Sequence, residues 1–146
     1  MGTRPLKRSA AQWLFVVCGV WLVCLGFYFI FVRPPLLPED VRYMGTHPEA
    51  VRAALPGLAA WLGKVFTVMG GFMTGAGVLV IYVALRVMPH QPPGTVEALV
   101  LVGALTVGLM SAVNFALGSD FKWLLLAPPV LWTAAVLTLL GGRATG

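Results

Sequence analysis

The run from Leu62 to Met88 constrains the fold most, because it is almost wholly apolar and yet rich in small residues. Its centre, from Gly70 to Gly77, reads GGFMTGAG. In water, each glycine would weaken a helix by roughly 1 kcal/mol relative to alanine. In a lipid bilayer, the same small residues let two helix backbones approach closely. The run therefore predicts a membrane-spanning helix whose glycine face is a packing surface.

The composition also indicates a membrane protein. Of the 146 residues, 59% are hydrophobic and 10% are charged, whereas a soluble domain is typically about 45–50% apolar and about 25% charged. The apolar runs that can cross a hydrocarbon core of about 30 Å are residues 13–32, 62–88, 95–117 and 121–140. The sequence therefore predicts an all-α polytopic membrane protein, with residues 1–146 forming a single four-helix membrane domain.

Residues 33–61 form the longest polar interval, and two short helices are expected within it. The first, in PEDVRYMG from Pro38 to Gly45, has proline at its start, acids in its first turn and glycine at its end. The second is expected to begin at Thr46, which has the capping-box spacing from Glu49. We expect an external amphipathic segment lying on the membrane surface. The alternative is a loop flanking a solvent-facing cap.

Small residues also predict how the spans pack. In the third span, small residues recur at every fourth position and form a ridge on one helix face: Ala104, Gly108, Ala112 and Ala116. We expect this ridge to pack against Gly71 and Gly75, since small faces let membrane helices approach closely. The predicted helix-packing residues are Gly70, Gly71, Thr74, Gly75, Ala104, Gly108 and Ala112. In the last span, Pro128 and Pro129 are expected to kink the helix or break it at Ala127.

The basic residues give the expected topology. With four spans, both termini lie on one side, and each side then carries five Lys or Arg residues. The compact basic N-terminus, with Arg4, Lys7 and Arg8 beside the first span, favours cytoplasmic termini. We therefore expect a multi-pass protein of the cell inner (plasma) membrane with residues 33–61 outside. That side is the periplasm if the cell is a Gram-negative bacterium.

No motif predicts a catalytic, metal or cofactor site. The glycine run lacks the lysine of a phosphate-binding loop, and His47 and His90 are expected on opposite sides of the membrane. The basic residues are otherwise scattered singly, so we expect no nucleic-acid partner. The polar residues with a possible functional role are Lys64, Arg86, Glu97 and Asn114.

These four polar residues have simple structural interpretations as well. Arg86 and Glu97 flank one short loop and are expected to pair across it. Asn114 is expected to form a hydrogen bond with another helix, and Lys64 to extend towards the headgroups. A gating or substrate role is the alternative.

The segment LLPEDVRYMG (Leu36–Gly45), followed by Gly70, Gly71 and Gly75, resembles uncharacterised bacterial four-helix integral membrane proteins that are distantly DoxX-like. The resemblance covers roughly residues 13–85 and implies a four-helix membrane fold. Members often carry a His-Asp-Arg-like polar group just before the double glycine, whereas this chain has KVFTVM, from Lys64 to Met69.

Two functions are consistent with these patterns. The first is a non-enzymatic accessory or structural subunit that packs against partner proteins or membrane lipids in a larger membrane complex. The alternative is a small transporter or a quinone-linked redox subunit, which would need Asn114, Thr74 or Lys64 to face a cavity between the spans.

Overall fold

The computed structural model describes residues 9–144, and this part of the chain is helical and contains no strand. Its elements are α1 (Ala10–Phe31), α2 (Pro38–Tyr43), α3 (Pro48–Ala54), α4 (Leu58–Tyr82), the π-helical turn η1 (Val83–Val87), the 3₁₀ turn η2 (Met88–His90), α5 (Thr95–Gly103), the π-helical turn η3 (Ala104–Gly108), α6 (Leu109–Ala116) and α7 (Lys122–Ala144). The segments long and apolar enough to cross a membrane are Ala10–Phe31, Leu58–His90, Thr95–Ala116 and Lys122–Gly142. The predicted all-α fold with four candidate spans is therefore confirmed.

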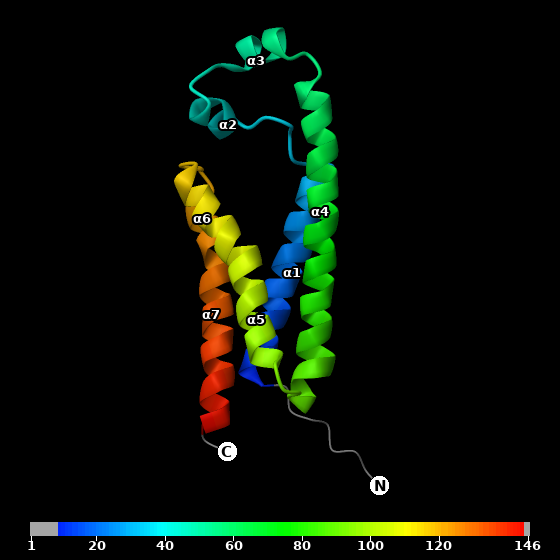
Figure 1. Ribbon diagram of the computed structural model, residues 1–146, viewed down its shortest axis with the longest axis vertical. Helices are drawn as coiled ribbons and strands as arrows, with labels where there is room; N and C mark the ends of the chain where they lie inside the picture. Colours follow the sequence, from blue (N-terminus) through cyan, green and yellow to red (C-terminus); the bar gives the residue numbers. More distant parts are fainter. Residues whose placement is uncertain (1–8, 145–146) are drawn as a thin grey trace.

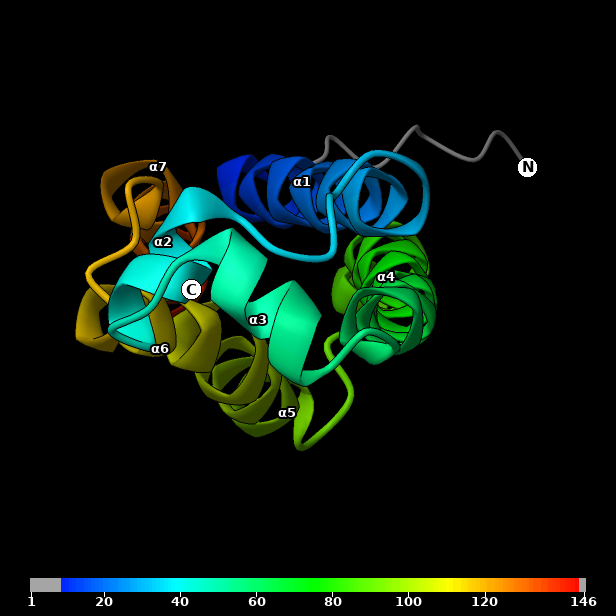
Figure 2. The ribbon, with the colours of Figure 1, turned by 90° about the horizontal axis from the view of Figure 1, so that it is seen from above.

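Helix α1 lies between α4 and α7 and packs on both of them. Helices α5 and α6, joined through η3, pack mainly on α7. Figure 1 shows that α4 and α6 diverge towards one end of the molecule, while α1 begins and α7 ends at the opposite end. Seen from above, α2 and α3 lie across the diverging end (Figure 2). We call this the α2–α3 end.

Aromatic packing joins α1, α5 and α7. The rings of Phe15 and Trp132 meet edge to face with 5.1 Å between centroids. The Trp132 indole N–H also donates a 2.9 Å hydrogen bond to the Leu99 carbonyl oxygen. The ring lies so close to Gly103 that no side chain would fit there. A buried indole N–H needs a hydrogen-bond partner, and here Leu99 of α5 supplies it. Trp132 therefore joins α7 to α1 through its ring and to α5 through its N–H group.

A second cross-helix contact lies near the start of α1. Ser9 and Gln12 form a capping box, in which the Ser9 amide donates to Gln12 Oε1 and the Gln12 amide donates to Ser9 Oγ. The buried Gln12 side chain also donates a 3.1 Å hydrogen bond to the Ala84 carbonyl oxygen. Ala84 lies in η1, where the helical hydrogen-bond pattern is irregular. Gln12 therefore satisfies a carbonyl group of the long second span.

Two local features differ from the sequence prediction. Of the two alternatives for the last span, the break at Ala127 is wrong, because helix α7 continues through Pro128 and Pro129, whereas the kink stays a prediction. Pro128 is fully buried, and Cys18 Sγ lies 3.8 Å from its carbonyl oxygen, so packing against α1 supports the helix at this point. At the start of α3, the N-cap residue is His47 and not Thr46, because the Thr46 amide closes the turn after α2 by donating to the Val41 carbonyl oxygen.

Candidate functional site at the α2–α3 end

The glycines of the central run divide between two faces of α4. Gly70 and Gly77 are buried against α1, where they meet Gly26 and Gly19 respectively. A Cβ atom added to Gly77 would lie 2.6 Å from the Gly19 carbonyl oxygen. Thr74 lies at the same contact, beside Gly26. The close approach of backbones predicted for this run is therefore made with α1, the first span.

Gly71 and Gly75 lie on the other face of α4. Both are exposed, and a Cβ atom added to either one would meet nothing within 4 Å in the described part of the chain. The predicted packing of these two glycines against the third span is therefore wrong within this chain. The physical reason is that α4 uses the face carrying Gly70 and Gly77 to pack on α1.

The predicted ridge of the third span also faces elsewhere. Ala104 and Ala112 are exposed and Gly108 is half-buried. The buried residues of this span lie on the adjacent face of the helix and include Leu99, Gly103, Val107 and Ser111. Gly103 packs on Trp132 of α7. The third span therefore packs on α7 through a face adjacent to the one that the sequence favoured.

The structure does not bring the predicted polar residues together. Lys64, Arg86 and Glu97 are exposed. Arg86 and Glu97 do not form the expected pair: the ion pairs among the described residues join Arg33 to Asp40 and Arg42 to Asp120. The Asn114 side chain donates a 2.9 Å hydrogen bond to the Met110 carbonyl oxygen, four residues earlier in the same helix. The expected bond to another helix is therefore wrong.

Polar contacts gather instead at the α2–α3 end, where α2 is fixed to the turn between α6 and α7. The Glu39 carboxylate is 9% exposed and accepts a 3.0 Å hydrogen bond from Ser119 Oγ and a 2.8 Å bond from the Asp120 amide. Arg42 pairs with Asp120 at 2.9 Å and donates to the Gly118 carbonyl oxygen. Glu39 therefore satisfies donors at the start of α7, 80 residues further along the chain.

Arg33 ties the same segment to α4. Its guanidinium carbon lies 3.6 Å from the centroid of the Phe66 ring and 5.2 Å from that of Phe29. The group also donates to Asp40, with 3.4 Å between nitrogen and oxygen, and its side chain is 10% exposed. A planar guanidinium stacks well on aromatic rings. Because α2 is held both to the α6–α7 turn and to Arg33, the segment bridges the two diverging arms of the bundle.

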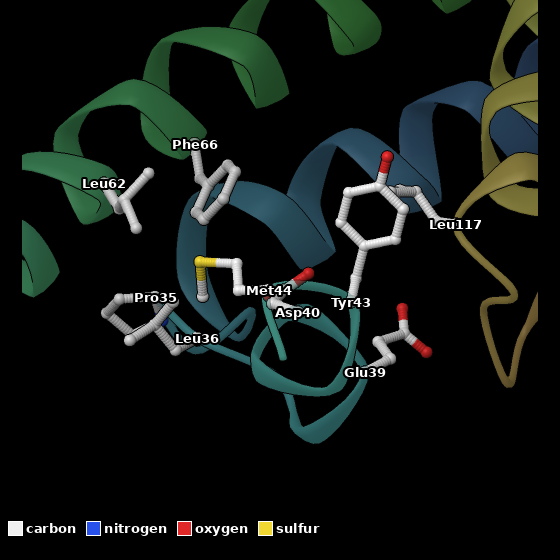
Figure 3. Close-up of a pocket in the computed structure, with 9 residues that line it drawn as sticks. All are labelled: Pro35, Leu36, Glu39, Asp40, Tyr43, Met44, Leu62, Phe66 and Leu117. Carbon is white, nitrogen blue, oxygen red and sulfur yellow. The ribbon is translucent and has the colours of Figure 1, made fainter. Parts of the chain in front are cut away.

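Beneath α2 lies a pocket of about 250 Å³, which we call the α2 pocket (Figure 3). Leu62 and Phe66 of α4 line one side, and Leu117 lines another. The remaining lining residues come from α2 and the segment before it: Pro35, Leu36, Glu39, Asp40, Tyr43 and Met44. The lining is mostly apolar, with two carboxylates on the α2 side. It lies beside the polar contacts that hold α2, and it joins residues of α2, α4 and the end of α6, so we take it as the candidate functional site.

The sequence missed three residues of this region. Arg33 and Ser119 belong to no motif of the sequence, and the capping rules place Glu39 only among the acids in the first turn of its own helix. No spacing rule links Glu39 to Ser119, so the sequence carried no signal for this contact.

Within residues 9–144, no three His, Cys, Asp or Glu side chains lie close enough to hold a metal ion. His47 and His90 are both exposed, at the N-cap of α3 and in η2. No protein-family model, curated protein or solved structure matches this chain. The resemblance to DoxX-like four-helix proteins therefore stays a prediction.

Proposed function

We propose that the protein is a non-enzymatic integral membrane protein that acts as an accessory or structural subunit, packing against a partner protein and lipids in a larger membrane complex. The observation that carries this proposal is the outward face of α4. Gly71 and Gly75 are exposed there, and a side chain added to either would meet nothing within 4 Å in the described chain. In lipid, such a small-residue face is typical of helix–helix contacts.

The geometry of this face supports a contact along most of the helix. At about 100° per residue, Lys64, Gly71, Gly75 and Tyr82 fall within roughly 40° of one another around α4. Lys64 and Tyr82 are also exposed. The stripe therefore has small residues at its centre, a cation at one end and an aromatic hydroxyl at the other. A partner helix could approach closely at the glycines and form polar contacts near the membrane surfaces.

The first test is purification of the full chain in mild detergent, with identification of the proteins and lipids that co-elute. We expect a partner membrane protein that is lost from the Gly71→Leu and Gly75→Leu variants, while the thermal stability of the chain is kept. Gly142→Leu in α7 is the matched control, since this glycine also meets nothing within 4 Å. Recovery of the chain alone, or equal partner loss in the control, would refute the proposal.

The transporter or quinone-linked alternative receives no support from the side chains on which it depended. Lys64 lies on the outward face of α4, Thr74 lies at the contact with α1, and Asn114 bonds within its own helix. None of the three lines the α2 pocket.

We also propose that both termini are cytoplasmic in the inner (plasma) membrane, with the α2–α3 end outside. The structure places the start of α1 and the end of α7 at the same end of the molecule (Figure 1), which is compatible with an even number of crossings. Labelling of single cysteines in intact cells tests the orientation. A cysteine at His47 should react with an impermeant maleimide, whereas one at His90 should react only after permeabilisation.

A further inference from the structure

The α2 pocket lies where the spans meet the polar segment. Arg33, two residues after the end of α1, packs on Phe66, which lines the pocket. Basic residues that follow a membrane span typically lie at headgroup level. The neighbouring Phe31 and Val32 are 77% and 67% exposed, as expected for side chains that contact lipid. The pocket is therefore placed at the boundary between hydrocarbon and headgroups.

The charged groups of the pocket are already paired. Glu39 accepts hydrogen bonds from Ser119 and the Asp120 amide. Asp40 pairs with Arg33 and also accepts a 2.8 Å bond from the Leu37 amide. A charged ligand would have to displace these partners, and an unpaired buried charge is costly. The pocket is thus suited to recognise an apolar group through Leu62, Phe66 and Leu117.

Tyr43 supplies one polar group that is free to bond. Its side chain extends from α2 into the space between the helices (Figure 3). The residue is 65% exposed, and within the described chain its hydroxyl has no hydrogen-bond partner. A tyrosine hydroxyl can donate to a carbonyl oxygen. This arrangement, an apolar hollow with one hydroxyl beside it, matches a chain that carries a carbonyl group near its polar end.

We propose that the α2 pocket binds one acyl chain of a membrane phospholipid, with the Tyr43 hydroxyl donating to the ester carbonyl. The volume of about 250 Å³ lies just below the range of roughly 300–1,000 Å³ usual for drug-sized ligands, and it fits a chain segment better than a folded peptide. A lipid can also reach the pocket from the bilayer without crossing water, since the pocket lies at the boundary between hydrocarbon and headgroups. The inference specifies the lipid part of the proposed function and needs no protein partner.

The test uses the purified full chain in nanodiscs of phosphatidylcholine. A fraction of the lipid carries a diazirine near the ester end of one acyl chain, and the cross-links are mapped by mass spectrometry. We expect adducts on residues 36–44 to exceed those around Phe72, on the lipid-exposed part of α4, by at least several-fold. Equal labelling of the two regions would overturn the proposal.

Two kinds of variant sharpen this test. Leu117→Trp fills the pocket and should abolish the excess labelling, whereas Leu137→Trp, at an exposed position of α7, should leave it unchanged. If Leu117→Trp fails to fold, Met44→Trp fills the pocket from the half-exposed side of α2. Tyr43→Phe should reduce the excess by about 2- to 10-fold, the value of one hydrogen bond. Unchanged labelling in every pocket variant would refute the site.

Two further outcomes identify a wrong occupant. If an equimolar prenylquinone removes the labelling while added unlabelled phosphatidylcholine does not, the phospholipid assignment is wrong. If the pocket is labelled only when a protein partner is absent, that partner and not the lipid fills it in the complex. Because the assay uses the chain alone, failed labelling with retained partner binding would overturn this inference and leave the proposed function standing.

Discussion

The contact between α1 and α4 predicts opposite effects of the same substitution at two nearby positions of α4. Gly77 is buried against α1, whereas Gly75, two residues earlier, is exposed. In Gly77→Ala, the new methyl group would lie 2.6 Å from the Gly19 carbonyl oxygen and 2.8 Å from the Val23 amide nitrogen. Ordinary contact begins at 3.4 Å, and the neighbouring atoms belong to backbone, so the helices must separate.

The size of the effect follows from that separation. To bring the new methyl group from 2.6 Å to an ordinary 3.4 Å from the Gly19 carbonyl oxygen, α1 and α4 must separate by about 0.8 Å. A gap of about 0.5–1 Å loses a quarter to a half of the dispersion energy of each affected contact between the helices. Overpacking of this kind typically costs about 1–3 kcal/mol. In Gly75→Ala the methyl group meets nothing within 4 Å. That variant should be neutral, or slightly stabilised because alanine favours the helix.

The assay is reversible unfolding of the monomeric protein in mixed micelles, followed by circular dichroism, with the two variants compared under identical conditions. We expect Gly77→Ala to lower the free energy of unfolding by about 1–3 kcal/mol relative to Gly75→Ala. Gly70→Ala, whose methyl group would meet the Gly26 carbonyl oxygen, should behave like Gly77→Ala. The proposed α1–α4 packing is refuted if Gly77→Ala is neutral, or if Gly75→Ala is equally destabilising in the monomer.

Three other substitutions test the remaining contacts. Trp132→Phe keeps a ring against Phe15 but loses the hydrogen bond to Leu99, so thermal unfolding should show a loss of about 1 kcal/mol; no change would contradict the role of the indole N–H. Glu39→Ala leaves Ser119 and the Asp120 amide without their acceptor, and amide hydrogen exchange at the start of α7 should rise, whereas Glu49→Ala on the exposed surface should leave it unchanged. Thr74→Val removes a buried hydroxyl that has no partner among the described residues, so stability should rise by about 1 kcal/mol; a clear loss would mean that the hydroxyl is bonded in the membrane.

Much of the fold could be predicted from the sequence because the bilayer imposes simple rules. Each span must be a long apolar helix, since lipid offers no hydrogen-bond partners to the backbone. The predicted limits 62–88 and 95–117 therefore agree with Leu58–His90 and Thr95–Ala116 to within a few residues. The short helix α2 is expected from proline at its start and from acids in its first turn. Helix α3 is expected from the Thr46–Glu49 spacing, and it forms with His47 as its N-cap instead.

The pairing of the spans could not be predicted in the same way. In lipid, a helix face that packs and one that meets lipid are both apolar, so hydrophobicity does not distinguish them. Gly71 and Gly75, four residues apart, form the small-residue pair that is conspicuous in the sequence. The relevant spacing is seven residues, or about two turns, and it occurs in both partners: Gly19 and Gly26 in α1 and Gly70 and Gly77 in α4.

The α2 pocket was harder still to anticipate, because its parts are distant in sequence. The capping rules assigned the acids of α2 to their own helix. That is correct for Asp40, which accepts from the Leu37 amide. Glu39 instead bonds to Ser119 and Asp120, on the far side of two spans. Only the packing of α1 between α4 and α7 brings these residues to one end of the molecule.

Helix α4 contributes to both the α1–α4 contact and the α2 pocket. One face of this helix packs on α1 so closely that Gly70 and Gly77 admit no side chain. The opposite face carries a second pair of small residues, Gly71 and Gly75, that nothing in the described chain covers. Glycine weakens a helix, and Gly71 and Gly75 have no packing role within residues 9–144 to offset this cost. A helix partner outside the chain would supply that role, and it could bind without disturbing either the α1–α4 contact or the α2 pocket.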